Sequence, residues 1–258
     1  MSAWRIDQFG KKPNLSKTVL IEGLPGIGNV GKVAIDFIVD ELGAKKIYEI
    51  TSHTFPNSVF VNEKNLVELP KIEIFYKKCK DNDLLLMGGD VQPIDEISSY
   101  DFAEKILDIA ESFKAKQIIT LGGIGLAEIP KTPKLYCTGN CKQIIKKYKS
   151  RGVNDQLYGI VGPIVGVSGL LLGLATRRNI NSVSLLAETY GHPMYLGVKG
   201  AREILKILNH ELGLSLNVDK LEKEIDYIEN QGIKGKEEVL PKHGVLKRTK
   251  KGEVSYIG

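Results

Sequence analysis

Short apolar runs of strand length alternate along this chain with stretches of helical periodicity. Two runs, Asp83–Met87 and Lys116–Leu121, are almost continuously apolar, as in strands that are buried on both faces. Between them, Tyr100–Phe113 carries apolar side chains at helical spacing. Because strands and helices alternate with short links, the sequence predicts an α/β fold, with a mostly parallel central sheet covered by helices on both faces.

The remaining elements follow from the same periodicities. Further strands are expected at Thr18–Glu22, Lys46–Ile50 and Asn181–Ala187, and further helices at 29–42, 138–148, 169–178, 200–212 and 218–231. Gly43 is expected to end the first of these helices. A hairpin at 58–69, with a strand at 71–76 beside it, would add an antiparallel portion.

The chain divides at residue 231 into a globular part and a basic tail. No linker or internal repeat interrupts residues 1–231, so we expect a single α/β domain there. Residues 232–258 carry +4 of the net charge of +5 and few apolar side chains, which predicts a flexible tail. Apolar residues return at its end, as Val254, Tyr256 and Ile257. This pattern suits docking into a pocket of a partner, although a frayed terminus is the alternative.

Composition excludes several classes of protein. A hydrophobic content of 42% and a charged content of 26% are ordinary for a globular chain. No run approaches the roughly 20 apolar residues that span a bilayer, and a charge lies where a signal peptide would have its apolar core. We therefore expect a cytoplasmic protein without a membrane partner. The basic charge lies in the tail rather than on a patterned face, so a nucleic-acid partner is not expected either.

The cysteines and histidines do not form a metal-binding pattern. Cys137 and Cys141 are four residues apart, but no second pair of Cys or His lies near them in the sequence. A zinc site needs about four convergent ligands, so neither a metal site nor a metal cofactor is expected.

A glycine-rich turn follows the first apolar strand and opens a helix. Its glycines, Gly26, Gly28 and Gly31, have the G-x-G-x-x-G spacing of a dinucleotide-binding turn. Glu49 lies in the next predicted strand, where such proteins place the acid that binds the ribose. The alternative interpretation is structural: the glycines let the turn close tightly and let the helix approach the sheet.

A second glycine-rich segment and several ionisable residues follow other predicted strands at the same edge of the sheet. Gly122–Gly125 is expected to end the strand before it in a second glycine-rich turn. Asp90 with Asp95, or Glu188 with His192, would supply a pair of groups for acid/base work. Capping and turn formation are the alternative for the two aspartates. No nucleophile is evident beside Glu188 and His192.

Five motifs occur in a fixed order along the chain: Leu20–Lys32, Gly88–Pro93, Thr120–Gly125, Val167–Gly173 and Leu185–Thr189. Together they resemble the archaeal branch of the proteasome assembly chaperone 2 family, over roughly residues 15 to 230. The resemblance implies a three-layer fold like that of nucleoside phosphorylases, without their active-site equipment. It implies a non-catalytic protein without a cofactor, whose glycine-rich turns are structural.

The resemblance also implies partners. Members of the family bind the α-ring of the proteasome core particle, and archaeal members resemble self-associating proteins, with a tetramer as one option for this chain. They are expected to act as assembly chaperones or activators. A nucleotide-binding enzyme that uses Gly26, Gly28 and Gly31 remains the alternative function.

The resemblance gives the tail a specific interpretation. Proteasome activators commonly end in a hydrophobic residue, a tyrosine and any residue, with the terminal carboxylate paired to a lysine between α subunits. Here Tyr256 is third from the end, Ile257 is penultimate and Gly258 is last. Either the motif is shifted by one residue, or Tyr256 fills the hydrophobic position and Ile257 replaces the tyrosine. Val254, Tyr256, Ile257 and Gly258 are the expected contacts with the α subunits.

Overall fold

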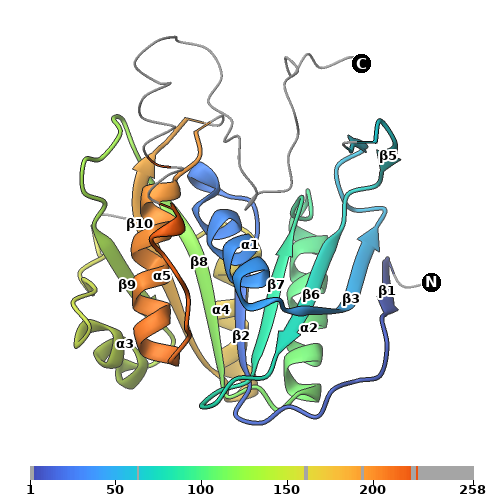
Figure 1. Cartoon of the computed structure of the whole chain (residues 1–258), viewed down its shortest axis with the longest axis horizontal. Helices are drawn as coiled ribbons and strands as arrows, with labels where there is room; N and C mark the ends of the chain where they lie inside the picture. The colour runs from blue at the N-terminus through green and yellow to red at the C-terminus, as the bar shows by residue number, and fades with distance from the viewer. Residues whose placement is uncertain (1–2, 63, 160–161, 193–194, 222–224, 226–258) are drawn as a thin grey trace.

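The computed structural model describes residues 3–62, 64–159, 162–192, 195–221 and 225. Its main strands are β1 (Trp4–Gln8), β2 (Val19–Gly23), β3 (Lys45–Ser52), β6 (Ile72–Lys77), β7 (Leu84–Gly89), β8 (Gln117–Leu126), β9 (Leu135–Gly139) and β10 (Asn181–Tyr190). They form one sheet in the order β1-β3-β6-β7-β2-β8-β10-β9 (Figure 1). The helices are α1 (Val30–Leu42), α2 (Glu96–Ser112), α3 (Lys142–Lys149), α4 (Val167–Ala175) and α5 (Val198–Leu212), with short 3₁₀ turns at Ile27–Asn29 and Thr176–Arg178.

The sheet has a parallel centre and antiparallel flanks. β7, β2, β8 and β10 run parallel to their neighbours in this group. β6, β3 and β1 add to one side of it, and β9 to the other, all through antiparallel pairings. The predicted α/β class is confirmed, with a sheet that is mixed at both edges.

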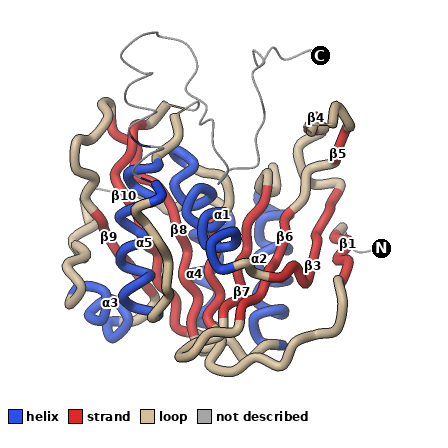
Figure 2. Tube along the Cα trace, viewed as in Figure 1, coloured by secondary structure: helices blue, strands red, loops and turns tan. Residues whose placement is uncertain are grey.

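Helices cover both faces of the sheet and make two cores (Figure 2). One core joins the sheet to α1, α3 and α5, and the other joins it to α2 and α4. Neighbouring residues of β2 divide between them, since Ile21 belongs to the first core and Leu20 to the second. β2 and β7 are buried along their whole length, as the continuous apolar pattern predicts for the centre of a three-layer fold.

Helix ends follow local chemistry. Gly43 ends α1 in the left-handed conformation with φ 55°, as predicted, because glycine adopts it without a steric penalty. α2 begins four residues before the predicted start. The Asp95 carboxylate accepts a hydrogen bond from the Ser98 amide at 2.9 Å and so caps the first turn.

Several predictions about individual elements are wrong. Residues 122–125 do not form a turn but continue β8, paired with Leu186–Thr189 of β10. The helix expected at 138–148 starts only at Lys142, as α3, because residues 138–139 belong to the strand β9. The strand β1 was missed. None of the helices in the described ranges is long and apolar enough to cross a membrane.

The hairpin exists but does not belong to the central sheet. Its strands, β4 (Phe60–Val61) and β5 (Val67–Glu68), form a separate two-stranded sheet. The strand predicted beside the hairpin, β6, pairs instead with β3 and β7. Within the last predicted helix, at 218–231, the described residues Lys220, Leu221 and Ile225 are helical. The rest of it and the predicted tail at 232–258 lie outside the described residues.

Candidate functional site

The glycine-rich turn is a point of very close packing between helix and sheet. A Cβ atom on Gly31 would lie 2.4 Å from the carbonyl oxygen of Leu121 in β8. A Cβ on Gly23, at the end of β2, would lie 2.3 Å from the Gly31 oxygen. Real Cβ atoms do not approach so closely, so α1 can reach β2 and β8 only because both residues are glycines.

The other side of the turn is filled by the end of β10 and the segment before α5. Gly28 has a left-handed φ of 60°, and a Cβ there would lie 2.6 Å from the Thr189 hydroxyl oxygen. The Gly197 amide donates a hydrogen bond of 2.7 Å to the Gly28 oxygen. A Cβ on Gly123 would lie 2.3 Å from the Ile27 oxygen. Gly28 of this turn and Gly123 of β8 therefore face other parts of the same chain.

Glu49 is not near this turn. It lies in β3, which is separated from β2 by β6 and β7. At about 4.8 Å between neighbouring strands, that places it roughly 14 Å away along the sheet. Its carboxylate accepts a hydrogen bond of 2.8 Å from the Lys46 amine, which lowers the pKa of Glu49. The structure brings Gly26, Gly28 and Gly31 together but does not bring Glu49 to them.

Asp90 and Asp95 have different partners in the structure. Asp95 caps α2, as described above. Asp90 lies instead near Asp36 and Lys32 of α1, and burial raises the pKa of both carboxyl groups. Lys32 bridges to Asp36 at 3.1 Å. Sequence reasoning missed this group, although the spacing of four residues between Lys32 and Asp36 was a signal for it.

Glu188 is engaged with the edge of the sheet. Its two oxygens accept hydrogen bonds from the Lys134 amide at 3.0 Å and from the Tyr136 hydroxyl at 3.2 Å. His192 stacks on Tyr190, with ring centroids 5.7 Å apart. Both oxygens of Glu188 thus join β10 to the segment that enters β9, which is a structural role.

A buried carboxyl group lies in the centre of the sheet, and sequence reasoning did not single it out. Glu22 is fully buried in β2, opposite Thr120 of β8. The Leu24 amide donates a hydrogen bond of 2.9 Å to it. Burial raises the pKa of Glu22 to about 7, against the smaller opposing effects of this amide and the Ser168 hydroxyl. The signal was an acid at the end of an otherwise apolar strand.

Gln92 connects the glycine-rich turn to α4. Its side-chain amide donates to the Pro25 oxygen at 2.6 Å, and its side-chain oxygen accepts from the Val167 amide at 3.1 Å. Three of the sequence motifs therefore meet at the start of α4. The Gln92 side chain thus connects the turn to the helix through hydrogen bonds to backbone groups of both.

The positions of Cys137 and Cys141 indicate structural rather than chemical roles. Burial raises the pKa of the Cys137 thiol to about 11, so it stays protonated and unreactive near neutral pH. Cys141 lies immediately before α3, at its N-cap. Within the ranges that the structure describes, no group of three or more His, Cys, Asp or Glu residues is placed to hold a metal ion. The expected contacts Val254, Tyr256, Ile257 and Gly258 lie outside those ranges.

Comparison with known proteins places this architecture in a family. The model of the PAC2 family matches residues 20–233. The chain belongs to the PAC2 family. The assignment agrees with the resemblance drawn from the five sequence motifs. An uncharacterized Methanocaldococcus jannaschii protein, MJ1210, is 30% identical over 95% of this chain and 93% of its own length.

Two solved structures of PAC2-like proteins are similar along most of this chain. Pyrococcus furiosus PbaB, an archaeal proteasome activator, has a TM-score of 0.81 at 33% identity, over 90% of this chain and 98% of its own. Pyrococcus furiosus PbaA, an archaeal homolog of proteasome-assembly chaperone, has a TM-score of 0.74 at 26% identity, over 90% of this chain and 91% of its own.

Proposed function

We propose that this chain is a non-catalytic, homo-oligomeric protein that binds the proteasome core particle, as an assembly chaperone or an activator. In this proposal residues 1–231 form one α/β domain, and the tail at 232–258 carries the contact through Val254, Tyr256, Ile257 and Gly258. These residues dock into pockets of the α-ring. The similarity to the activator PbaB carries the proposal, because it extends over 90% of this chain.

The packing of the candidate nucleotide-binding and acid/base residues supports a binding role. The glycine-rich turn is in contact with Thr189 and Gly197 of the same chain. Glu188, a member of one candidate acid/base pair, holds the edge of the sheet through both oxygens. The polar groups at the ends of the central strands thus connect elements of the fold to each other.

The tail suits the proposed contact in length and charge. A flexible segment of this length spans on the order of 30 Å between its ends. Several tails on one oligomer act together, since the first contact raises the effective concentration of the others. The seven basic residues of the tail favour approach to an acidic surface, and this attraction weakens as salt is added.

The test compares the full chain with a chain that ends at Glu253. Each is immobilised and mixed with purified core particle, and peptide hydrolysis by the core particle is measured in parallel. We expect the full chain to retain the core particle and the shortened chain to lose it, with unchanged thermal unfolding. Faster peptide hydrolysis that is lost with the shortened chain identifies an activator. Equal retention by both chains contradicts the tail contact.

The nucleotide-binding alternative has a direct test of its own. A nucleotide that binds the folded chain raises its stability by about 2.7 kcal/mol at 100 times the dissociation constant. We expect no such rise with NAD or with nucleoside phosphates, because Glu49 lies far from the turn and is paired with Lys46. A saturable rise in the unfolding temperature would restore this alternative.

A further inference from the structure

Three loops meet where the parallel strands of the sheet begin. They are residues 11–18 before β2, 78–83 before β7 and 113–116 before β8. Because β2 lies between β7 and β8, the loops are neighbours at the lower end of the sheet, opposite the end with the glycine-rich turn (Figure 1). Neighbouring strands lie about 4.8 Å apart, so the three loops follow one another over about 10 Å.

Hydrogen bonds hold these loops to one another. The Lys116 amide donates to the Thr18 oxygen at 2.8 Å, and the Thr18 hydroxyl donates to the Phe113 oxygen at 2.9 Å. On the other side, the Asp83 amide donates to the Ser16 oxygen at 3.2 Å, and the Asp83 carboxylate accepts from the Ser16 amide at 2.7 Å. The side chains of the three loops are therefore presented from one connected framework.

The loops carry seven lysines and two aspartates. We call the lysines the lysine surface; all are exposed, and they are Lys11, Lys12, Lys17, Lys78, Lys80, Lys114 and Lys116. Among the described residues, no carboxylate lies within 4.0 Å of any of these amines. Asp83 is engaged with backbone amides, and the Asp81 carboxylate faces Gly213. Lys12 donates to the Ser112 oxygen at 3.0 Å, which leaves its charge without a counterion.

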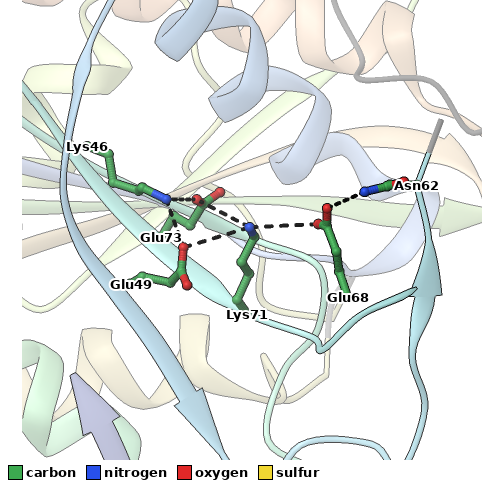
Figure 3. Close-up of polar contacts among 6 residues, drawn as sticks. All are labelled: Lys46, Glu49, Asn62, Glu68, Lys71 and Glu73. Atoms are coloured by element: carbon green, nitrogen blue, oxygen red, sulfur yellow. Dashed lines mark hydrogen bonds and ion pairs between the residues drawn. The ribbon is translucent and has the colours of Figure 1, made fainter. Parts of the chain in front are cut away.

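Lysines of β3 and β6 show the contrast. The Lys46 amine lies 2.8 Å from the Glu49 carboxylate and 2.9 Å from that of Glu73. The Lys71 amine lies 3.9 Å from the Glu68 carboxylate (Figure 3). Carboxylates thus balance the lysines of that region, whereas the lysine surface keeps its positive charge.

Two members of the lysine surface have an unusual backbone conformation. Lys17 and Lys114 are left-handed, with φ of 47° and 54°. A Cβ atom disfavours this conformation, and Gly and Asn adopt it more readily than lysine does. The chain therefore carries lysine at two positions that suit other residues better, which indicates that the amines themselves are used.

We propose that the lysine surface binds the phosphate backbone of a nucleic-acid duplex without reading its sequence. Lysine amines bind phosphates as point charges and release the counterions that surround the duplex. Such contacts to the backbone position a protein but carry no sequence information. A nucleic-acid partner was not expected from composition, because the small net charge of residues 1–231 conceals a surface that other acidic residues balance elsewhere in the fold.

The surroundings of the lysines favour a duplex over other anionic partners. Interfaces between proteins have an apolar core and are poor in lysine. None of the large apolar side chains that are exposed in the described part of the chain lies in these three loops. Proteins that bind single strands stack bases on aromatic side chains, and Phe113, the aromatic residue of the loops, is buried. A duplex asks only for the charge that this surface offers.

The test measures the affinity of the full chain for duplex DNA and duplex RNA of about 20 base pairs, by fluorescence anisotropy at several salt concentrations. It does not involve the core particle, so its result is independent of the proposed function. The test variant combines Lys17→Asn with Lys114→Asn, because asparagine tolerates the left-handed conformation and the fold is retained. The matched control combines Lys250→Asn with Lys251→Asn, which removes the same charge from the basic tail.

We expect the full chain to bind two unrelated sequences equally well, with an affinity that falls steeply as salt is added. The test variant should bind about tenfold more weakly or worse at about 50 mM salt, and its slope of log affinity against log salt should be smaller by about 1.8. The control should lose clearly less, and the unfolding temperatures of all three chains should agree. Binding of either duplex supports the surface, and the tighter of the two identifies its source.

Three results would overturn the proposal. They are no binding of either duplex at about 50 mM salt, equal losses in the test variant and the tail control, and binding of polyglutamate as tight as that of the duplex. The last result would assign the surface to an acidic protein. A second variant, Lys78→Gln with Lys80→Gln, changes only exposed positions of the loop before β7. We expect the same loss of affinity from it, and unchanged binding would also contradict the proposal.

Discussion

At the scale of single residues, Glu22 makes the stability of the chain depend on pH. Its carboxyl group is fully buried between two layers of helices, and its pKa is raised from 4.5 to about 7. Between these two values the folded chain keeps this proton and the unfolded chain releases it. The free energy of unfolding therefore falls as the pH rises through this window, and the loss is complete above pH 7.

The variant Glu22→Gln tests this dependence. The amide keeps the shape of the side chain and cannot ionise, so we expect the loss of about 3 kcal/mol between pH 4.5 and pH 7 to be largely absent from it. Urea unfolding at pH 5 and pH 8 measures the difference. Glu128→Gln makes the same chemical change at an exposed position and should behave like the original chain. An equal pH dependence in all three chains would contradict the assignment.

At the scale of elements, the sequence predicted the features that depend on the local residue pattern. It missed the features that depend on which strands pair with each other. The continuous apolar runs of β7 and β8 were recognised, and Gly43 ended α1 as expected. The order of the strands could not be predicted, because hydrophobic periodicity does not tell which strands are neighbours. For this reason Glu49 was expected near the glycine-rich turn. Residues 122–125 looked like a turn, yet their pairing with β10 keeps them in β8.

The glycines of the turn differ in how closely other atoms pack against them, and so in how much the contact between α1 and the sheet depends on them. Gly31 has the Leu121 oxygen within 2.4 Å of its missing Cβ, whereas Gly26 has open space around it and an extended φ of −161°. We expect Gly31→Ala to lower the free energy of unfolding by about 3 kcal/mol or more, because backbone must move. Gly26→Ala should change it little.

Urea unfolding of the two variants makes this comparison. A dinucleotide-binding role would make both glycines matter for the ligand and would not predict such a difference in the ligand-free chain. Similar unfolding free energies for the two variants would therefore count against the packing role of Gly31.

At the scale of the whole molecule, the fold separates two kinds of surface. The central strands end in contacts between elements of the same chain, through Thr189, Gly197, Gln92 and Glu188. The hairpin of β4 and β5 lies beyond the ends of β3 and β6 and carries exposed aliphatic side chains. Together with the predicted tail, this arrangement suits a protein that works by binding, as the proposed contact with the core particle requires.

The most direct test of the central claim is the affinity of the chain for the core particle, measured with Tyr256→Ala and with Ser255→Ala. The two positions are adjacent in the tail, so length, charge and the terminal carboxylate are the same in both variants. Removing a buried aromatic anchor from an interface typically costs about 2 kcal/mol or more. We predict that Tyr256→Ala raises the dissociation constant at least tenfold and that Ser255→Ala leaves it unchanged. Equal affinities for the original chain and Tyr256→Ala would contradict the account.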